Sequence, residues 1–239
     1  MCAMGVGRIL KAGDCAMSFE NRTDAGRQLA GRLLNYKDRD PVILALPRGG
    51  VPVAAEVAAL LDAPLDLLIV RKIGVPTQPE LAMGAVAEGA EATVVRNADV
   101  IELCQVSAAE FDSVCRDEQA EIERRSKRYL KGRHRAQIKG RLAIVIDDGI
   151  ATGATIHAAI KAVRKQGPEE IVLAVPVAPL ETLEKLRPEV DVIVCLDTPV
   201  ELGAIGYFYR DFHQVSDEEV IALLEQYGSK EPVKRSANP

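Results

Sequence analysis

Short apolar segments that alternate with helical patterns constrain the fold of this chain more than any other feature. The segments rich in Val, Ile and Leu are 41–47, 64–72, 141–147, 170–177 and 190–197, and helical patterns lie at 51–63, 154–167 and 179–187. Near-continuous apolar strands separated by helices are typical of a parallel sheet covered on both faces. The alternation therefore predicts an α/β fold built on such a sheet.

Two segments between the second and third strands interrupt this alternation. Residues 73–100 are rich in Gly, Pro and Ala and predict a loop plus a small hairpin. Residues 107–131 predict one long helix, because Ser107 and Glu110 have the spacing of a capping box. Its narrow apolar stripe consists of Phe111, Cys115, Ile122 and Tyr129.

The two ends of the chain complete the predicted organisation. Residues 1–16 are expected to be a disordered or non-native extension, and residues 17–215 to form the core with an insertion at 73–139. The C-terminal segment 197–230 holds most of the few aromatic residues and ends in a helix with a second capping box, Ser216 to Glu219.

Composition limits the classes of function. The 239 residues carry a net charge of −5, which disfavours a general nucleic-acid role because that depends on a basic surface. No apolar run approaches the roughly 20 residues that span a bilayer, and the N-terminus lacks the apolar core of a secretory signal. The five cysteines are scattered without a CxxC pair, so we expect reduced thiols and a cytoplasmic protein.

The residues just past each strand are the first candidates for a site, because ligands of such sheets bind at the carboxyl ends of the strands. "DDGIATGAT" (147–155) joins the third strand to a helix. The free N–H groups at a helix start suit a phosphate, and Thr152 and Thr155 add hydroxyl donors. Two carboxylates would repel that anion unless they bind ribose hydroxyls or a divalent metal carried by the ligand. The alternative is an Asp-Gly turn with Thr155 capping a helix.

The whole string resembles the 5-phosphoribosyl-1-pyrophosphate signature of type I phosphoribosyltransferases. An apolar strand is followed by two acids, two variable residues, a small residue, Thr, Gly, a small residue and Thr. The resemblance implies that the residues of one loop bind the phosphoribosyl group. They are Asp147, Asp148, Gly149, Ala151, Thr152, Gly153, Ala154 and Thr155.

Two other strand ends are similar to the same family. "LPRGG" (46–50) resembles its pyrophosphate loop, in which Arg48 and Gly49 would hold the diphosphate. Arg71 and Lys72 match a basic pair at the start of a mobile loop and would serve the leaving pyrophosphate. Taken alone, these segments also read as a turn and as a solvated strand end.

The resemblance covers roughly residues 20–200 and is closest to uncharacterised bacterial phosphoribosyltransferase-like proteins that share "LPRGG" and a tail like "YRDFHQVSDEEV". It implies a five-stranded parallel sheet flanked by helices, a small hood and an inserted long helix. It also implies transfer of a phosphoribosyl group to a nucleobase-like nitrogen acceptor, as in nucleotide salvage. Asp147 and Asp148 would hold the ribose and contact Mg²⁺ indirectly, through substrate or water.

The acceptor is less constrained. Enzymes for 6-oxopurines have an aspartate where this chain has Ala151, which cannot transfer a proton, so that class is disfavoured. Glu80 is the best substitute acid or base, although a surface carboxylate is the alternative. The aromatic residues of the tail, Tyr207, Phe208 and Tyr209, are candidates for stacking on a flat ring, or for a small core.

A second class of function remains open, a regulator that senses phosphoribosyl pyrophosphate without turnover. Retention of Arg71 and Lys72 favours an enzyme, and a homodimer without a membrane or nucleic-acid partner is expected. The basic run at 124–135 is interpreted as a solvated face, with an RNA contact or a dimer contact as alternatives. His134, His157 and His213 have no metal-binding spacing.

Overall fold

The computed structural model describes residues 8–10, 19–88 and 92–228. Most of the extension predicted at 1–16, together with Cys2 and Cys15, lies outside these residues, as do the last two residues of the segment 197–230. The part of residues 1–16 that is described forms a short strand at the edge of the main sheet, β1 (Arg8–Leu10).

The main sheet is parallel throughout and has the strand order β1-β9-β8-β7-β2-β3. The five predicted strands are all present, and β1 extends the sheet by pairing with β9. Their bounds are β2 (Val42–Ala45), β3 (Leu65–Leu67), β7 (Leu142–Ile146), β8 (Glu170–Val177) and β9 (Val192–Asp197). The prediction of an α/β fold with a five-stranded parallel core is therefore confirmed.

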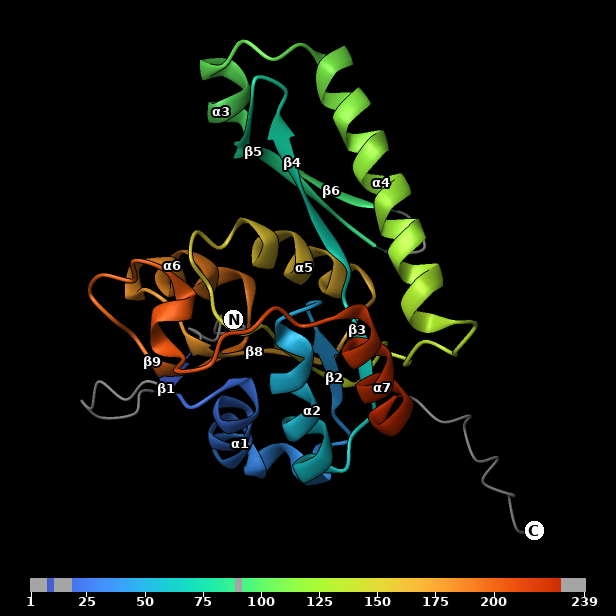
Figure 1. Ribbon diagram of the computed structural model, residues 1–239, viewed down its shortest axis with the longest axis vertical. Helices are drawn as coiled ribbons and strands as arrows, with labels where there is room; N and C mark the ends of the chain where they lie inside the picture. Colours follow the sequence, from blue (N-terminus) through green and yellow to red (C-terminus); the bar gives the residue numbers. More distant parts are fainter. Residues whose placement is uncertain (1–7, 11–18, 89–91, 229–239) are drawn as a thin grey trace, which may run out of the picture.

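Helices cover both faces of this sheet (Figure 1). On one face lie α1 (Arg22–Arg32), α2 (Gly50–Leu61) and α7 (Asp217–Tyr227), and on the other α5 (Ala154–Lys165) and α6 (Leu180–Leu186). Side chains alternate along a strand, so Ile43 joins the core with α1 and α2 while Leu44 joins the core with α5. Short 3₁₀ helices are η1 (Leu34–Arg39), η2 (Arg187–Glu189) and η3 (Ile205–Phe208).

The predicted strand 64–72 is divided between two sheets. After β3 the chain leaves the parallel sheet at Leu68 and Ile69, and β4 (Val70–Val75) pairs with β5 (Gln78–Ala87) in an antiparallel sheet. Residues 65–69 are buried, whereas Val70, Arg71 and Lys72 at the start of β4 are half-buried.

The described residues 70–88 and 92–130 form an upper unit that stands over α5 (Figure 1). It contains the sheet β4-β5-β6 with β6 (Thr93–Arg96), then α3 (Ala98–Leu103) and α4 (Ala108–Leu130). The segment predicted as a loop with a small hairpin is thus mostly sheet. The long helix was predicted correctly, since Ser107 and Glu110 form the capping box and the four stripe residues are buried.

The basic run at 124–135 does not form the freely solvated face that we expected. Arg128 contacts Asp217 and Glu218 on α7 at 3.0 and 3.1 Å, and Arg133 donates to the carbonyl of Leu224. Arg135 contacts the buried carboxylate of Asp66 on β3 at 3.2 Å. These ion pairs fasten the upper unit to the body, because α4 ends beside α7 and not in open solvent.

Two further features of the described part of the chain concern its cysteines and its helices. Cys104, Cys115 and Cys195 are free thiols, and no pair of cysteines in this part is joined. No helix in the same residues is long and apolar enough to cross a lipid bilayer.

Candidate functional site

The loops that follow β2 and β7 lie side by side at the carboxyl edge of the sheet. The Leu46 N–H donates to the carbonyl of Ile146 at 2.9 Å, which aligns the two strand ends. Gly50 approaches the backbone of Asp147 so closely that a Cβ on Gly50 would lie 2.9 Å from the Asp147 Cα. Gly49 and Gly50 are therefore required for this contact because they lack side chains.

The loop 147–155 forms a small cavity at the start of α5. Gly153 precedes the helix with φ of +81°, a conformation that favours glycine, and no side chain caps the helix. The cavity has a volume of about 240 Å³ and is lined by residues 147–156 and by Ile205. Uncapped N–H groups at a helix start and a ring of small residues can hold a phosphate.

A larger cavity of about 570 Å³ adjoins the same loop. It lies between the upper unit and the helices α5 and α6, and Thr152, Gly153 and Ala154 line both cavities. The hydroxyl of Thr182, in the first turn of α6, donates to the carbonyl of Ala151 at 2.9 Å and so fixes the outer side of the loop.

Asp147 follows the last residue of β7 and faces the smaller cavity. Its Oδ1 accepts the N–H of Asp148 at 2.9 Å. Burial raises the pKa of Asp147 well above its ordinary value, and the adjacent carboxylate of Asp148 raises it further. The folded protein therefore holds a proton on this acid more tightly than the unfolded chain does.

Asp148 is in a different environment, since its carboxylate is already paired. Arg22 on α1 donates from Nε to Oδ2 at 2.7 Å, and both side chains are buried. The hydroxyl of Tyr209 donates to the Asp148 carbonyl at 2.5 Å. Burial raises the pKa of Asp148, and Arg22 counteracts that shift. Sequence reasoning missed Arg22, and no motif around it gives a signal.

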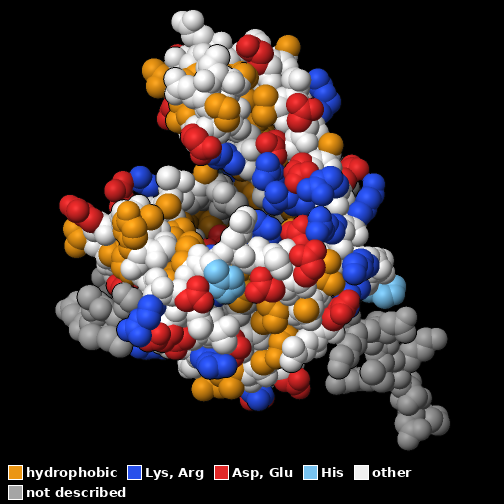
Figure 2. Space-filling view, viewed as in Figure 1, with side chains coloured by type: hydrophobic (Ala, Val, Ile, Leu, Met, Phe, Trp, Pro, Cys, Tyr) orange, Lys and Arg blue, Asp and Glu red, His pale blue; other side chains and the backbone are white. Residues whose placement is uncertain are grey.

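Arg48 extends from the loop after β2 toward the end of α4. Its guanidinium lies 3.6 Å from Asp217, which also accepts the hydroxyl of Tyr129 at 2.6 Å and contacts Arg128 at 3.0 Å. The hydrogen bond from Tyr129 is the main reason that the pKa of Asp217 lies below its usual value. The peptide bond between Pro47 and Arg48 is cis. Figure 2 shows Lys and Arg side chains gathered where the upper unit meets the body.

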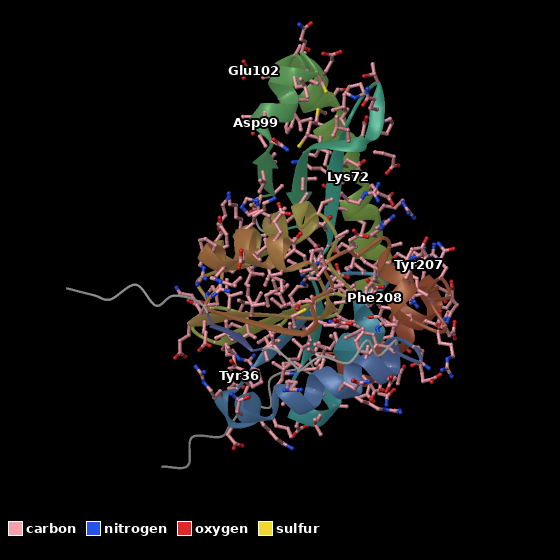
Figure 3. The ribbon with its side chains drawn as sticks, turned by 90° about the vertical axis from the view of Figure 1, so that its left-hand side faces the viewer. Tyr36, Lys72, Asp99, Glu102, Tyr207 and Phe208 are labelled. Atoms are coloured by element: carbon pink, nitrogen blue, oxygen red, sulfur yellow. The ribbon has the colours of Figure 1, made fainter. Side chains whose placement is uncertain are left out.

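Arg71 and Lys72 lie on β4 of the upper unit and not at the end of a parallel strand (Figure 3). Arg71 donates to Glu118 on α4 at 2.6 Å. Lys72 contacts the carboxylate of Glu80 at 3.2 Å and donates to its carbonyl at 2.9 Å. The fully exposed Glu80 is thus held by Lys72, across the β4–β5 hairpin.

The tail aromatics divide into different roles. Tyr209 is buried against Phe19, with 5.3 Å between the ring centres, so its ring is not available for stacking on a ligand. Phe208 is half-buried and packs beside Phe19 and Tyr209, whereas Tyr207 is 78% exposed (Figure 3). Ile205 lies against Gly149, where a Cβ would fall 2.6 Å from its Cγ2. Among the described tail residues, Ile205 lines the smaller cavity.

The side chains near the loop offer few ligands for a metal ion. Among the described residues no group of three His, Cys, Asp or Glu side chains has a metal-binding arrangement. His157 contacts Glu189 and the exposed His213 contacts Asp211, each at 3.2 Å. A single carboxylate such as Asp147 fits Mg²⁺ only when substrate phosphates and water supply the remaining oxygen ligands.

The raised pKa of Asp147 predicts a pH-dependent stability. Because the folded protein binds this proton more tightly, the acid favours folding at low pH and costs stability as pH rises through its folded-state pKa. Asp147→Asn is therefore expected to raise the melting temperature at neutral pH, with the advantage lost below about pH 4, near the unfolded pKa. Thermal unfolding followed by circular dichroism across this pH range measures the difference.

The exposed Asp38 provides the matched control, because Asp38→Asn removes an acid of the same type from the surface. Its melting curve is expected to follow that of the intact protein at every pH. Identical pH profiles for Asp147→Asn and the intact protein would contradict the proposed protonation of Asp147.

Comparisons with known proteins identify a family and related proteins. A family model described as "Phosphoribosyl transferase domain" matches residues 18–209. A Mycobacterium tuberculosis protein named "Putative phosphoribosyl transferase", found in two strains, is 49% identical over 208 residues, which are 87% of this chain and 46% of the relative. The chain thus spans about half the length of the curated relatives that it matches.

A solved structure of TT1426 from Thermus thermophilus is 39% identical to the chain, with a TM-score of 0.76. The match covers 89% of this chain and 100% of the other. Both matches span the loops that carry the candidate site. The chain belongs to the phosphoribosyl transferase domain family.

Proposed function

We propose that the protein transfers the 5-phosphoribosyl group from 5-phosphoribosyl-1-pyrophosphate to a nucleobase-like nitrogen acceptor and releases pyrophosphate. One observation carries the proposal. The phosphate loop 147–155 and the Arg48-containing loop meet at one edge of the sheet, with Gly50 in contact with Asp147. This arrangement suits a ligand that has a phosphate at one end and a diphosphate at the other.

In this proposal, separate groups of residues bind the 5-phosphate, the ribose and the diphosphate. The N–H groups at the start of α5, together with Thr152 and Thr155, bind the 5-phosphate. The carboxylate of Asp147 accepts hydrogen bonds from the ribose hydroxyls once its proton is released. Arg48 leaves its 3.6 Å contact with Asp217 to bind the diphosphate. The reacting anomeric carbon is then held between two fixed anionic ends, which is the geometry that transfer requires.

Departure of pyrophosphate leaves a cation-like sugar, as in other glycosyl transfers. Arg71 and Lys72 stabilise the departing negative charge in this proposal. Both are engaged by Glu118 and Glu80, so the reaction requires exchange of those carboxylates for phosphate oxygens. Mg²⁺ would neutralise part of the diphosphate charge, and Asp147 would contact it indirectly, through the substrate or water.

The acceptor must lie near Ala151, where the loop provides no group that transfers a proton. Ile205 is a candidate wall for this subsite because it lies against Gly149, and Phe208 and Tyr207 are candidates at its rim. Glu80 is the candidate acid or base, since an exposed carboxylate on the hairpin is free to approach once Lys72 releases it. Nucleotide salvage and a homodimer are predictions of the same proposal.

A sensor of phosphoribosyl pyrophosphate is the second candidate function. The ion pairs of Arg71 and Lys72 favour a sensor, because Glu118 and Glu80 already neutralise the two cations that an enzyme would use to stabilise the leaving pyrophosphate. A screen of purine and pyrimidine bases and related heterocycles for pyrophosphate release separates the two. An enzyme is expected to release pyrophosphate with at least one acceptor, whereas binding of the sugar diphosphate without release from any acceptor would support the sensor.

A further inference from the structure

Asp148 has partners that Asp147 lacks, although both acids line the same cavity. The carboxylate of Asp148 is paired with Arg22 at 2.7 Å, and the side chains of Arg22 and Asp148 are 9% and 12% exposed. A buried acid with a guanidinium partner is neutralised as a pair, so little of its charge acts on a ligand beyond that pair.

Arg22 is itself held on two other sides. A second nitrogen of its guanidinium donates to the carbonyl of His213 at 2.7 Å, and the group stacks at 3.8 Å over the ring of Phe212. Planar guanidinium groups bind carboxylates and stack on aromatic rings in ways that an ammonium group cannot. Arg22 therefore fixes the Asp148 carboxylate relative to α1 and the C-terminal tail.

The fixed carboxylate also lies against the Arg48-containing loop. A Cβ added to Gly49 would fall 2.0 Å from Oδ2 of Asp148, the same oxygen that accepts from Arg22. The position of this oxygen therefore limits how far the loop can move toward β7. Pairing with Arg22 also removes a negative charge that would otherwise repel a diphosphate bound at this loop.

We propose that the two aspartates act differently. Asp147 is the acid that contacts the ribose, whereas Asp148 and Arg22 are positioning residues that set the diphosphate loop through Gly49. This inference rests on the proposed function for the identity of the ligand. It assigns a role to Arg22 and removes Asp148 from the set of acids that bind the sugar directly.

Two probes distinguish the roles, because ribose 5-phosphate lacks the diphosphate that 5-phosphoribosyl-1-pyrophosphate carries. Calorimetry with Mg²⁺ is expected to give about 10-fold weaker binding of the sugar diphosphate to Asp148→Asn and to Arg22→Met, the loss of roughly one charge-assisted hydrogen bond. Affinity for ribose 5-phosphate is expected to stay unchanged in both variants. Asp147→Asn is expected to weaken both ligands.

Arg27→Met is the matched control, since Arg27 lies on the same helix and pairs with Glu56 at 3.1 Å with its side chain 69% exposed. This variant is expected to bind both probes normally. Arg22→Lys is expected to recover part of the lost affinity, because it keeps the charge but not the guanidinium contacts. In urea unfolding, the double variant Arg22→Met/Asp148→Asn is expected to lose no more stability than the more affected single variant.

For each folded variant, the affinities for the sugar diphosphate and for ribose 5-phosphate are compared with each other. A general loss of stability would weaken both, so it would not produce the expected selective loss. Equal weakening of ribose 5-phosphate by Asp148→Asn and Asp147→Asn would overturn the division of roles while leaving the proposed function intact. Additive unfolding effects of Arg22→Met and Asp148→Asn would also overturn it. Failure of the intact protein to bind the sugar diphosphate would overturn the proposed function together with this inference.

Discussion

Replacing both Asp147 and Asp148 by asparagine is expected to abolish detectable binding of 5-phosphoribosyl-1-pyrophosphate with Mg²⁺. The variant removes the carboxylate that we propose to bind the ribose, and it breaks the buried pair of Asp148 with Arg22. Each lost charge-assisted hydrogen bond is worth about 1.5–3 kcal/mol, so the combined affinity loss is at least about 100-fold. Calorimetry with the intact protein as reference measures this loss.

The control for this experiment must test folding, because an unpaired Arg22 destabilises the protein when its partner is removed. Circular dichroism and the melting temperature show whether the double variant is folded under the binding conditions. Asp38→Asn is the control for loss of an exposed acid and is expected to bind normally. Unchanged affinity in a folded double variant would refute the assignment of this loop as the sugar site.

A methyl group at Gly49 is expected to be as damaging as the loss of both acids. The added Cβ would lie 2.0 Å from Oδ2 of Asp148, so either the loop or the Arg22–Asp148 pair must move. Gly49 has φ of −59°, which alanine adopts readily, so the cost is one of packing and not of backbone strain. Gly49→Ala is therefore expected to lose about 1–3 kcal/mol of stability, as overpacked sites do, together with diphosphate binding.

Gly31→Ala is the matched control because Gly31 lies in α1 with no atom within 4 Å of the added Cβ. Alanine is favoured over glycine inside a helix by about 0.5–1 kcal/mol, so this variant is expected to be slightly more stable. Urea unfolding gives both stabilities, and calorimetry with pyrophosphate and Mg²⁺ gives the affinities. A Gly49→Ala variant that binds as tightly as Gly31→Ala would show that the close approach of the two loops is unimportant.

Features that depend on neighbouring residues in the chain were predictable. The run 142–146 is apolar and the loop after it is rich in small residues, so a buried strand followed by a helix start was evident. The capping boxes at Ser107 and Ser216 were correct for the same reason, since their partners are three residues away. The fold class followed from the order of these local elements.

Features that depend on packing were not predictable in the same way. The stretch 64–72 read as one strand, yet its two halves belong to different sheets, since β3 pairs with β2 and β4 pairs with β5 of the upper unit. The basic run at 124–135 read as a solvated face, but α4 ends against α7 and β3, where Asp66 and Asp217 receive the charges. Its neighbours in the sequence give no information about those partners.

The sequence by itself determined that two acids and a loop of small residues follow a buried strand, since strand, turn and helix start are encoded within about twenty consecutive residues. The tertiary structure alone decided that these acids differ. Arg22 lies 126 positions before Asp148, and packing of α1 on one face of the sheet brings the two side chains within 2.7 Å. No guanidinium is paired with Asp147 among the described residues, and burial raises the pKa of this acid well above its ordinary value.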